Sequence, residues 1–457
     1  MRRPLVLLLV ALGLAGCGGG AAATTRTAQS TATRPAQQQP PAGDARDPWT
    51  PLSALADVAT RNHGTRAAGT PGGAATEDLI ERTLRAAGWT VRFQRVAFPF
   101  FDERRPPLVA LPGGRRLRPE RDARTLAYSS GGDVRAAVRV VGGARADAGC
   151  RAGDFGGFPR GRIALVRRGV CPFAAKARAA QRAGAAAIVI DDRAAAGARG
   201  PVSGTLGAPG IRIPVVAVDA AAGAALRRAG GAVRVRVDAV SERRTARDVL
   251  AELPGRGGGS RVVMAGAHLD SVAAGPGIND DGSGVATLLA LAARLAGGPR
   301  PAATIGLGFW TAEELGLYGS RAYVRGLSAA ERGRIPRYVN LDMVGSPNAV
   351  LETYGSGETE AALRRALAAR GPVPNHRSIG GASDHASFQR AGIEVGGVFT
   401  GASGRVSRAS AERFGARAGR PADPCYHQAC DTLRNVNRPV LERVADAVEV
   451  AVRELAG

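Results

Sequence analysis

Aromatic residues and long apolar runs are both scarce in this 457-residue chain. Phe, Trp and Tyr make up 4% of it, and the arginines are scattered rather than arranged in stripes. A nucleic-acid-binding surface combines clustered cations with aromatic side chains, so we expect no nucleic-acid partner. The apolar run at the N-terminus, residues 4–15, is too short to cross a bilayer as a helix.

The net charge of +23 comes from 62 basic and 39 acidic residues, and nearly all of the basic ones are arginine. Arginine, alanine and glycine together dominate the chain, which is typical of a protein encoded by a GC-rich genome. The alternative is that the charge attracts the protein to an anionic cell envelope or to nucleic acid. We favour the first interpretation, so the charge alone assigns no partner.

The N-terminus predicts export. Arg2 and Arg3 precede the apolar run, as in a signal peptide. The motif "LAGC" (14–17) resembles the lipobox of bacterial lipoproteins, which implies that Cys17 is lipidated and becomes the new N-terminus. An ordinary cleaved signal is the alternative. We therefore expect residues 1–17 to be a lipoprotein signal peptide and the protein to be anchored through a lipid to the outer face of the cytoplasmic membrane, or else secreted.

The segment after the signal, residues 18–48, is rich in Gly, Ala, Thr, Gln and Pro. It contains no apolar side chain larger than Ala. Such a segment cannot bury enough apolar surface to offset the entropy lost on folding. We predict a disordered tether.

Export places the four remaining cysteines in an oxidising environment, where cysteines pair. Four cysteines allow three connectivities, and proximity in the sequence favours Cys150–Cys171 and Cys425–Cys430. The second couple encloses a histidine in "DPCYHQACD" (423–431). A zinc cluster is the alternative there, but two cysteines and one histidine are one ligand short of a closed site. We therefore predict a disulfide clasp that presents His427 to another site.

The chain divides into a main part and an inserted module. Residues 52–87 predict two helices, residues 89–98 a strand, and residues 104–107 a proline-rich break. Between about residues 109 and 238, short strands alternate with helices of small residues. The segment "GRIALVRRGVCPFAAKARAAQRAGAAAIVI" (161–190) resembles the protease-associated (PA) domain, which implies a β-rich α+β domain inserted into the main fold.

From Thr245 onward, apolar strands alternate with helices. This pattern predicts an α/β fold with a mostly parallel or mixed sheet between helices on both faces. In such sheets, ligands bind at the carboxyl ends of the strands. Polar residues follow three predicted strands at that end: His268, Asp270, Glu313, Glu314 and Asp342. Together with the carboxylates of "GINDDGSG" (277–284), they are the ligand types of a hard or borderline divalent metal.

The chain also contains six motifs that resemble, in order, the signature blocks of the M28 family of zinc aminopeptidases, in its secreted bacterial branch: "AHLDS", "GINDDGSG", "TAEELGLYGS", "VNLDMVGS", "GGASDHASF" and "DPCYHQACD". The resemblance covers about residues 53–455. It implies the zinc exopeptidase fold in residues 49–105 and 241–457, interrupted by the PA domain in residues 106–240. It also implies an exported, monomeric enzyme that removes N-terminal residues from peptide substrates.

The resemblance implies a site with two zinc ions. One ion takes His268 and Asp342, the other takes Glu314 and His427, and the carboxylate of Asp280 bridges both. Two ions about 3.5–4 Å apart can hold a hydroxide and polarise a carbonyl. In the family, the peptide bond that follows the bridging aspartate is cis. The motifs give no basis for placing a calcium ion (Ca2+).

Three further residues take catalytic roles by the same resemblance. Glu313 holds no metal and can move the proton of the attacking water to the leaving amine. Asp270 follows His268 by two residues, where its carboxylate can fix the tautomer of the imidazole. Tyr426 can donate a hydrogen bond to the oxyanion.

Two other functions share this architecture. An M28-type carboxypeptidase or dipeptidase would need an arginine or lysine at the site to bind a C-terminal carboxylate. The blocks around the metal ligands contain no arginine, and we expect Arg321 and Arg390, which follow helical stretches, at the surface. We therefore expect N-acetylation of a substrate to abolish cleavage and C-terminal amidation to matter little. The second alternative is a non-catalytic binding protein, but no ligand position is missing here.

Overall fold

The computed structural model describes residues 43–143, 145, 147–193 and 200–457. The predicted signal peptide, the lipid at Cys17 and most of the predicted tether lie outside these ranges. Residues 43–48 are described, and there the Asp47 carboxylate accepts a hydrogen bond from Arg438 (2.7 Å). The tether over residues 18–48 stays a prediction. Within the described ranges, no helix is long and apolar enough to span a membrane.

A sheet of 13 strands organises the fold, in the order β12-β11-β13-β10-β8-β9-β7-β3-β4-β5-β6-β2, with β1 paired to β7. The main part contains β8 (Val262–His268), β9 (Thr304–Trp310), β10 (Arg337–Leu341), β11 (Glu352–Gly355), β12 (Asn375–His376) and β13 (Glu394–Phe399). Strands β9, β8, β10 and β13 lie side by side in that order and are parallel to one another. Every residue of β8 and β9 is buried, because layers on both faces cover them, so these strands are nearly continuous apolar runs.

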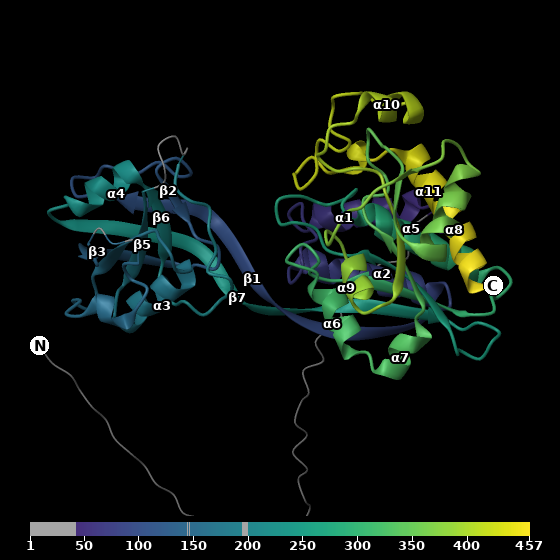
Figure 1. Ribbon diagram of the computed structural model, residues 1–457, viewed down its shortest axis with the longest axis horizontal. Helices are drawn as coiled ribbons and strands as arrows, with labels where there is room; N and C mark the ends of the chain where they lie inside the picture. Colours follow the sequence, from purple (N-terminus) through teal and green to yellow (C-terminus); the bar gives the residue numbers. More distant parts are fainter. Residues whose placement is uncertain (1–42, 144, 146, 194–199) are drawn as a thin grey trace, which may run out of the picture. The chain divides into compact units, whose positions relative to one another are not determined.

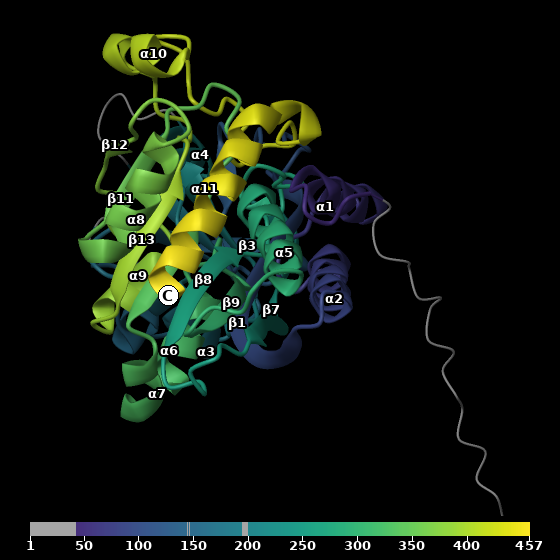
Figure 2. The same cartoon turned by 90° about the vertical axis from the view of Figure 1, so that its right-hand side faces the viewer.

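Helices cover both faces of this part of the sheet (Figures 1 and 2). The larger apolar core lies under α1 (Trp49–Arg61), α2 (Pro71–Ala86), α5 (Gly282–Ala296), α8 (Gly357–Ala368) and α11 (Arg438–Ala456). The opposite core lies under α6 (Tyr318–Gly326) and α9 (His385–Arg390) and includes Trp310 and Tyr338. Two short helices complete this part, α7 (Ala329–Arg334) and α10 (Arg408–Phe414). The predicted α/β class with a mixed sheet between helices is confirmed.

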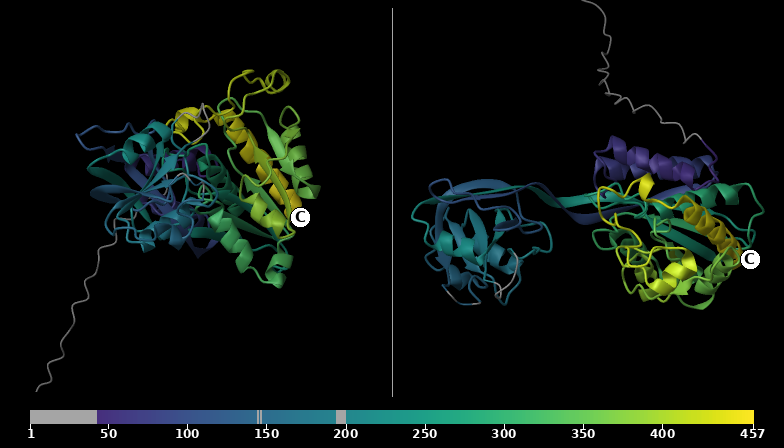
Figure 3. Two further views of the ribbon diagram at one scale, coloured as in Figure 1. Left: turned by 60° about the vertical axis from the view of Figure 1, so that its left-hand side comes forward. Right: turned by 90° about the horizontal axis from the view of Figure 1, so that it is seen from above.

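Two long strands, β1 (Thr90–Ala110) and β7 (Ala232–Leu253), pair antiparallel along almost their whole length (Figure 3). The prolines that predicted a break, Pro106 and Pro107, lie inside β1. Proline cannot donate to a strand ladder and is tolerated where the pairing is irregular, and the register shifts at this point. The predicted break is therefore wrong. The boundaries expected after residues 105 and 240 lie nearly opposite each other on this strand pair.

The PA region forms the other end of the sheet. It contains β2 (Ala123–Thr125), β3 (Gly132–Val141), β4 (Ile163–Arg167), β5 (Ala187–Asp192) and β6 (Val215–Asp219), with helices α3 (Phe173–Arg182) and α4 (Ala220–Arg227). Apolar side chains form two separate clusters in this region. A disulfide joins Cys150 to Cys171. The strand and helix order predicted for residues 161–227 agrees with the structure.

Candidate metal centre and active site

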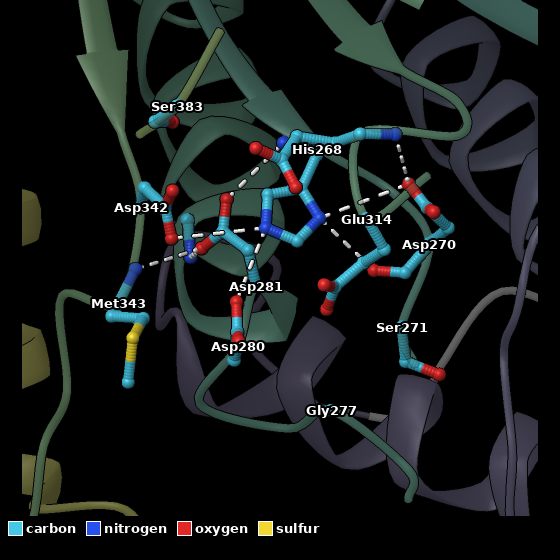
Figure 4. Close-up of polar contacts among 12 residues, drawn as sticks. His268, Asp270, Ser271, Gly277, Asp280, Asp281, Glu314, Asp342, Met343 and Ser383 are labelled. Atoms are coloured by element: carbon cyan, nitrogen blue, oxygen red, sulfur yellow. Dashed lines mark hydrogen bonds and ion pairs between the residues drawn. The ribbon is translucent and has the colours of Figure 1, made fainter. Parts of the chain in front are cut away.

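The parallel strands β8, β9 and β10 end at one edge of the sheet, and the predicted site residues follow them there (Figure 4). His268 is the last residue of β8, Glu313 and Glu314 lie in the turn after β9, and Asp342 follows β10 directly. Asp280 lies in the loop that leads into α5. Because parallel strands bring their carboxyl ends together, residues more than 70 positions apart share this rim.

The carboxylate of Asp280 lies between two histidines. Its Oδ1 is 3.1 Å from Nε2 of His268, and its Oδ2 is 3.2 Å from Nε2 of His427. Oδ1 of Asp342 is 3.7 Å from Nε2 of His268, and Oε2 of Glu314 is 3.1 Å from Nε2 of His427. Each histidine therefore faces one terminal carboxylate, and Asp280 connects the two pairs.

Asp281 also has an oxygen near this group, within 4.8 Å of ligand atoms of His268 and Asp342. Both of its oxygens are already used by backbone N–H groups. Oδ2 accepts from His268 (3.2 Å), and Oδ1 accepts from Gly284 (2.8 Å) and Met343 (3.2 Å). Asp281 therefore caps α5 and ties the ends of β8 and β10 together rather than serving as a ligand. The peptide bond that joins it to Asp280 is cis, as the family resemblance implies.

Burial and crowding set the protonation of the site. Hydrogen bonds to Asp280 and Glu314 raise the pKa of His427 to about 10, and burial raises the pKa of Glu314 to about 6. Burial alone would lower the pKa of His268, but the surrounding carboxylates, Glu313 first, raise it well above its usual range. Protons on the imidazoles thus hold the carboxylates together, and divalent cations would replace those protons.

The donor set fits such cations. Imidazole nitrogens and carboxylate oxygens are ligands that zinc takes. Among the described residues, the ion pairs of Asp280, Glu314 and Asp342 are all with histidines. The second oxygen of Glu314, Oε1, is buried and has no hydrogen-bond partner within those residues. A buried carboxylate oxygen without a donor is costly in a metal-free site, and a cation would satisfy it.

Asp270 supports the site in a different way from the one predicted. Nδ1 of His268 donates to the backbone carbonyl of Asp270 (3.1 Å), whereas the Asp270 carboxylate is 3.8 Å away. That carboxylate accepts instead from the backbone N–H of Glu313 (3.2 Å). Asp270 therefore fixes the imidazole tautomer mainly through its backbone and positions the turn of Glu313 through its side chain. The two-residue spacing of His268 and Asp270 does not reveal whether the imidazole bonds to the backbone oxygen or to the carboxylate.

A disulfide between Cys425 and Cys430 closes the loop that carries Tyr426 and His427. His427 has a φ of 59°, in the left-handed region. Its ring stacks on that of Tyr426, with centroids 3.8 Å apart. The clasp therefore orients two site residues that no strand supports.

Both ends of the clasp are anchored by buried side chains. Asp423 accepts from the N–H of Cys425 (2.7 Å), and Asp431 accepts from the N–H groups of Asn279 (2.9 Å) and Asp280 (3.1 Å). Asn435 donates to both aspartates (2.9 and 3.1 Å). The loop that presents one ligand is thus bonded directly to the residue that supplies the bridging carboxylate.

A cavity of about 290 Å³ opens onto the site. The predicted ligands, Glu313 and Tyr426 line it. The rest of the lining consists of Arg377, Ser378 and the apolar residues Met343, Ile379, Ala382, Phe399 and Ala402. A cavity of this size is near the lower end of the range for small-molecule sites, so it fits the end of a peptide rather than a long stretch of one.

Arg66 is a site residue that the sequence did not predict. It is fully buried and donates to the backbone carbonyls of Leu269 (2.6 Å), Pro276 (2.9 Å) and Gly277. Burial lowers its pKa, which nearby carboxylates partly offset. The three carbonyls belong to the loop between the first two predicted ligands, so Arg66 holds that loop in place. Its motif, "GTRAAGTPGG", indicated only a glycine turn.

Arg377 was missed as well. Arg321 and Arg390, which we expected at the surface, do not line the cavity, whereas Arg377, which the sequence analysis did not single out, does. It follows the two-residue strand β12 and forms an ion pair with Glu352 (2.9 Å). So short a strand leaves no recognisable pattern in the sequence.

Comparison with known proteins places the chain in a family. The profile of peptidase family M28 matches residues 248–452, and that of the PA domain matches residues 135–226. A "probable lipoprotein aminopeptidase" of Mycobacterium tuberculosis is 39% identical over 432 residues, which cover 89% of this chain and 84% of that protein. An aminopeptidase of Pseudomonas aeruginosa is 38% identical over 425 residues, covering 87% of this chain and 78% of that protein.

Solved structures agree with these matches. The aminopeptidase from Aneurinibacillus sp. strain AM-1 superposes with a TM-score of 0.63 at 28% identity, over 90% of this chain and 94% of that one. A zinc aminopeptidase from Bacillus subtilis gives a TM-score of 0.63 at 25% identity, over 92% and 96%. Since these relatives cover the PA region and the site together, the chain belongs to peptidase family M28, among its metallo-aminopeptidases, and carries a PA domain.

Proposed function

We propose that this chain is an exported aminopeptidase that works with two zinc ions and uses Glu313 as its general base. The observation that carries the proposal is the Asp280 carboxylate, which has one oxygen beside each of two histidines. A two-metal hydrolase needs such a bridging group to hold its ions close together. The Bacillus subtilis structure is named a zinc aminopeptidase, which supports the choice of metal.

The residues divide into two ligand sets. His268, Asp342 and one oxygen of Asp280 would hold the first ion, and His427, Glu314 and the other oxygen would hold the second. Two bound ions supply a Lewis acid for the scissile carbonyl and lower the pKa of the attacking water. Arg66 and the clasp would keep the two sets aligned.

Glu313 is placed to move the proton. It lines the cavity, and Asp270 holds its backbone N–H. Burial raises the pKa of its carboxyl well above the usual range, and nearby carboxylates add to the effect. Cations beside it would lower that pKa toward the working pH, where a general base is most effective. Glu313 can then take the proton of the attacking water and pass it to the leaving amine.

Tyr426 is placed to stabilise negative charge on the substrate. Burial raises its pKa above the ordinary tyrosine value, and Asp280 and Glu314 add to the effect. The hydroxyl therefore stays protonated and can donate to the oxyanion. Stacking on His427 restricts where the ring can lie, so this donor is aligned before the substrate arrives.

The carboxylates of the cavity favour a substrate with a free N-terminus. An α-amine is largely cationic near neutral pH, and Glu313 and Asp342 both line the cavity. Each can share a carboxylate oxygen with an ammonium group. This is the feature that favours an aminopeptidase over an enzyme that reads a C-terminal carboxylate.

Metal analysis tests the two-zinc proposal. We expect the purified enzyme to contain two zinc ions per chain, to lose activity on treatment with a strong chelator, and to regain it when zinc is restored. Activity that rises to its maximum with one zinc per chain would overturn the proposed stoichiometry. An active enzyme without zinc would overturn the choice of metal.

Blocked substrates test which end of the peptide is read. We expect acetylation of the N-terminus to abolish hydrolysis of an otherwise good tripeptide substrate. One observation favours the alternative carboxypeptidase, namely Arg377 on the cavity wall. If the acetylated peptide were cleaved and its C-terminal amide were resistant, that alternative would replace the aminopeptidase proposal.

Export and lipid attachment remain proposals from the N-terminal sequence, and a relative in Mycobacterium tuberculosis is named a lipoprotein. We propose lipidation of Cys17 and a monomeric enzyme at the outer face of the cytoplasmic membrane. Metabolic labelling with a fatty acid should mark the wild-type protein but not a Cys17→Ala variant. Equal labelling of both would show that Cys17 is not the attachment site.

A further inference from the structure

We propose that Arg377 is a specificity residue that binds a carboxylate on the leaving side of the substrate. That carboxylate is either the C-terminal α-carboxylate of a dipeptide or an acidic side chain in the residue after the scissile bond. The inference rests on the proposed aminopeptidase function, because only an enzyme that reads the α-amine defines this leaving side.

The lining of the cavity carries both signs of charge. Four carboxylates line it, those of Asp280, Glu313, Glu314 and Asp342. Arg377 is the one arginine or lysine among the residues that line the cavity. A dipeptide with free ends carries the complementary pair of charges, an ammonium at one end and a carboxylate at the other.

Arg377 is held in place before any ligand binds. Its backbone N–H donates to the carbonyl of Thr353 (2.9 Å), which extends the pairing of β12 with β11. Its Nη1 donates to Glu352 (2.9 Å), whose side chain is 13% exposed, and its guanidinium lies 5.5 Å from the centre of the Phe399 ring. A side chain held by an ion pair and an aromatic ring, on a backbone that is itself paired, loses less entropy on binding than a free one.

The ion pair with Glu352 leaves capacity for a second carboxylate. It uses Nη1 of the guanidinium, which has five N–H donors in a planar fork that matches a carboxylate. The Arg377 side chain is 49% exposed, so a ligand in the cavity can reach it.

The sheet places Arg377 apart from the metal centre. Arg377 follows β12, and three strand spacings, about 14 Å, separate β12 from β10, which ends at the site. Arg377 and the metal-binding residues nevertheless line one cavity. A short peptide whose α-amine lies at the carboxylates can therefore direct the carboxylate of its leaving residue toward Arg377.

Two matched substrate pairs test this inference. The first pair, Leu-Ala and Leu-Ala-amide, differs in the α-carboxylate. The second pair, Leu-Glu-amide and Leu-Gln-amide, differs in a side-chain carboxylate. In the wild type we expect the charged member of at least one pair to have the higher kcat/KM, by roughly tenfold or more. The difference should lie in KM, since the carboxylate keeps its charge through the reaction.

The Arg377→Gln variant should remove that preference while its kcat/KM on the neutral member stays near the wild-type value. Arg408→Gln is the matched control, because Arg408 is exposed at the start of α10 and does not line the cavity. It should leave both ratios unchanged. Arg377→Lys should restore only part of the preference, because an ammonium lacks the planar fork.

Each outcome decides the proposal. Loss of preference in the first pair assigns the α-carboxylate to Arg377, and loss in the second pair assigns the side chain. No preference in the wild type, or equal changes for both members of each pair in Arg377→Gln, would overturn the inference. Cleavage of N-acetylated Leu-Ala would instead overturn the aminopeptidase function, so the two failures are distinguishable.

Discussion

The disulfide between Cys425 and Cys430 should matter more for zinc than for folding. We expect the double variant Cys425→Ser/Cys430→Ser to bind zinc at the His427 position 10- to 100-fold more weakly, the range typical of a lost supporting interaction around a metal ligand. His427 is the only ligand of either set that comes from this loop. The first ligand set, around His268, should keep its affinity.

The expected loss of stability is small because the loop is short. The two cysteines are five positions apart, and closing a loop of that length lowers the unfolded-state entropy by the equivalent of about 2 kcal/mol. Asp423 and Asp431 still anchor the two ends of the loop through Asn279, Asp280 and Asn435. Only the residues between these anchors gain freedom, and they include the zinc ligand.

The PA region supplies a matched control. The disulfide Cys150–Cys171 spans 21 positions, so Cys150→Ser/Cys171→Ser should lose about 3 kcal/mol, more than the clasp variant, without any change in zinc affinity. Metal-stripped proteins would be titrated with zinc in competition with a chromophoric chelator, and their thermal unfolding would be followed by circular dichroism.

Two results would refute the reasoning. If the clasp variant bound both zinc ions with wild-type affinity, the disulfide would not be needed to present His427. If the PA variant lost zinc to the same extent, the effect would come from general destabilisation rather than from the clasp.

Three further predictions address the surroundings of the metals. Glu313→Gln keeps the shape of the side chain but removes the base, so turnover should fall by roughly 100-fold or more while the zinc content stays unchanged; near-normal turnover would mean that another group is the base. Arg66→Met leaves the buried carbonyls of Leu269 and Pro276 without a donor, whereas the Gly277 carbonyl keeps the N–H of Gly282. It should lower the unfolding free energy by about 2 kcal/mol or more and weaken zinc binding, and Arg66→Lys should not restore either property because one ammonium cannot span three acceptors; a wild-type denaturation midpoint for Arg66→Met would contradict this. Asp384, the buried residue directly before α9, has a pKa that burial raises from 3.8 to about 7. The folded metal-free protein therefore holds this proton more tightly than the unfolded chain, and its stability should fall by about 4 kcal/mol as the pH rises from about 4 to 7; Asp384→Asn should flatten that dependence in urea titrations, and an unchanged slope would exclude Asp384 as its source.

The residues that sequence analysis located correctly are marked by local signals. Strands β8 and β9 are buried on both faces, so they read as apolar runs, and a polar residue directly after such a run must lie at the strand end. His268, Glu313 and Glu314 were found in this way. The glycine-rich motif before α5 is equally local: Gly277 has a φ of 60°, and a Cβ there would lie 2.3 Å from the Asp280 carbonyl oxygen.

The features that were missed depend on contacts between distant parts of the chain. Arg66 lies about 200 positions before the carbonyls that it binds, and nothing in its own turn distinguishes it from the other arginines. The spacing of His268 and Asp270 does not determine whether the imidazole bonds to the backbone carbonyl or to the carboxylate of Asp270, because that depends on side-chain rotation. The prolines of β1 predicted a break because proline disrupts ladders, whereas the partner strand β7 accommodates them through a shift in register.

Composition does not distinguish the arginines that contribute to the site from the others. The arginines are scattered along the sequence, yet Arg66 is buried and Arg377 lines the cavity. The single lysine of the chain, Lys176, makes the same point. It is fully buried, burial lowers its pKa, and its Nζ donates to the carbonyl of Ala148 beside the disulfide at Cys150.

A guanidinium is planar with five donors, whereas an ammonium is a compact point charge. Arg66 uses this geometry, because its guanidinium donates to three carbonyls at once. Lys176 donates from its single Nζ to one carbonyl, beside a sulfur. The choice between arginine and lysine therefore carries functional information only where the structure buries or orients the side chain. Exchanging the two residue types at Arg66, Arg377 or Lys176 should lower stability or activity more than the same exchange at an exposed position.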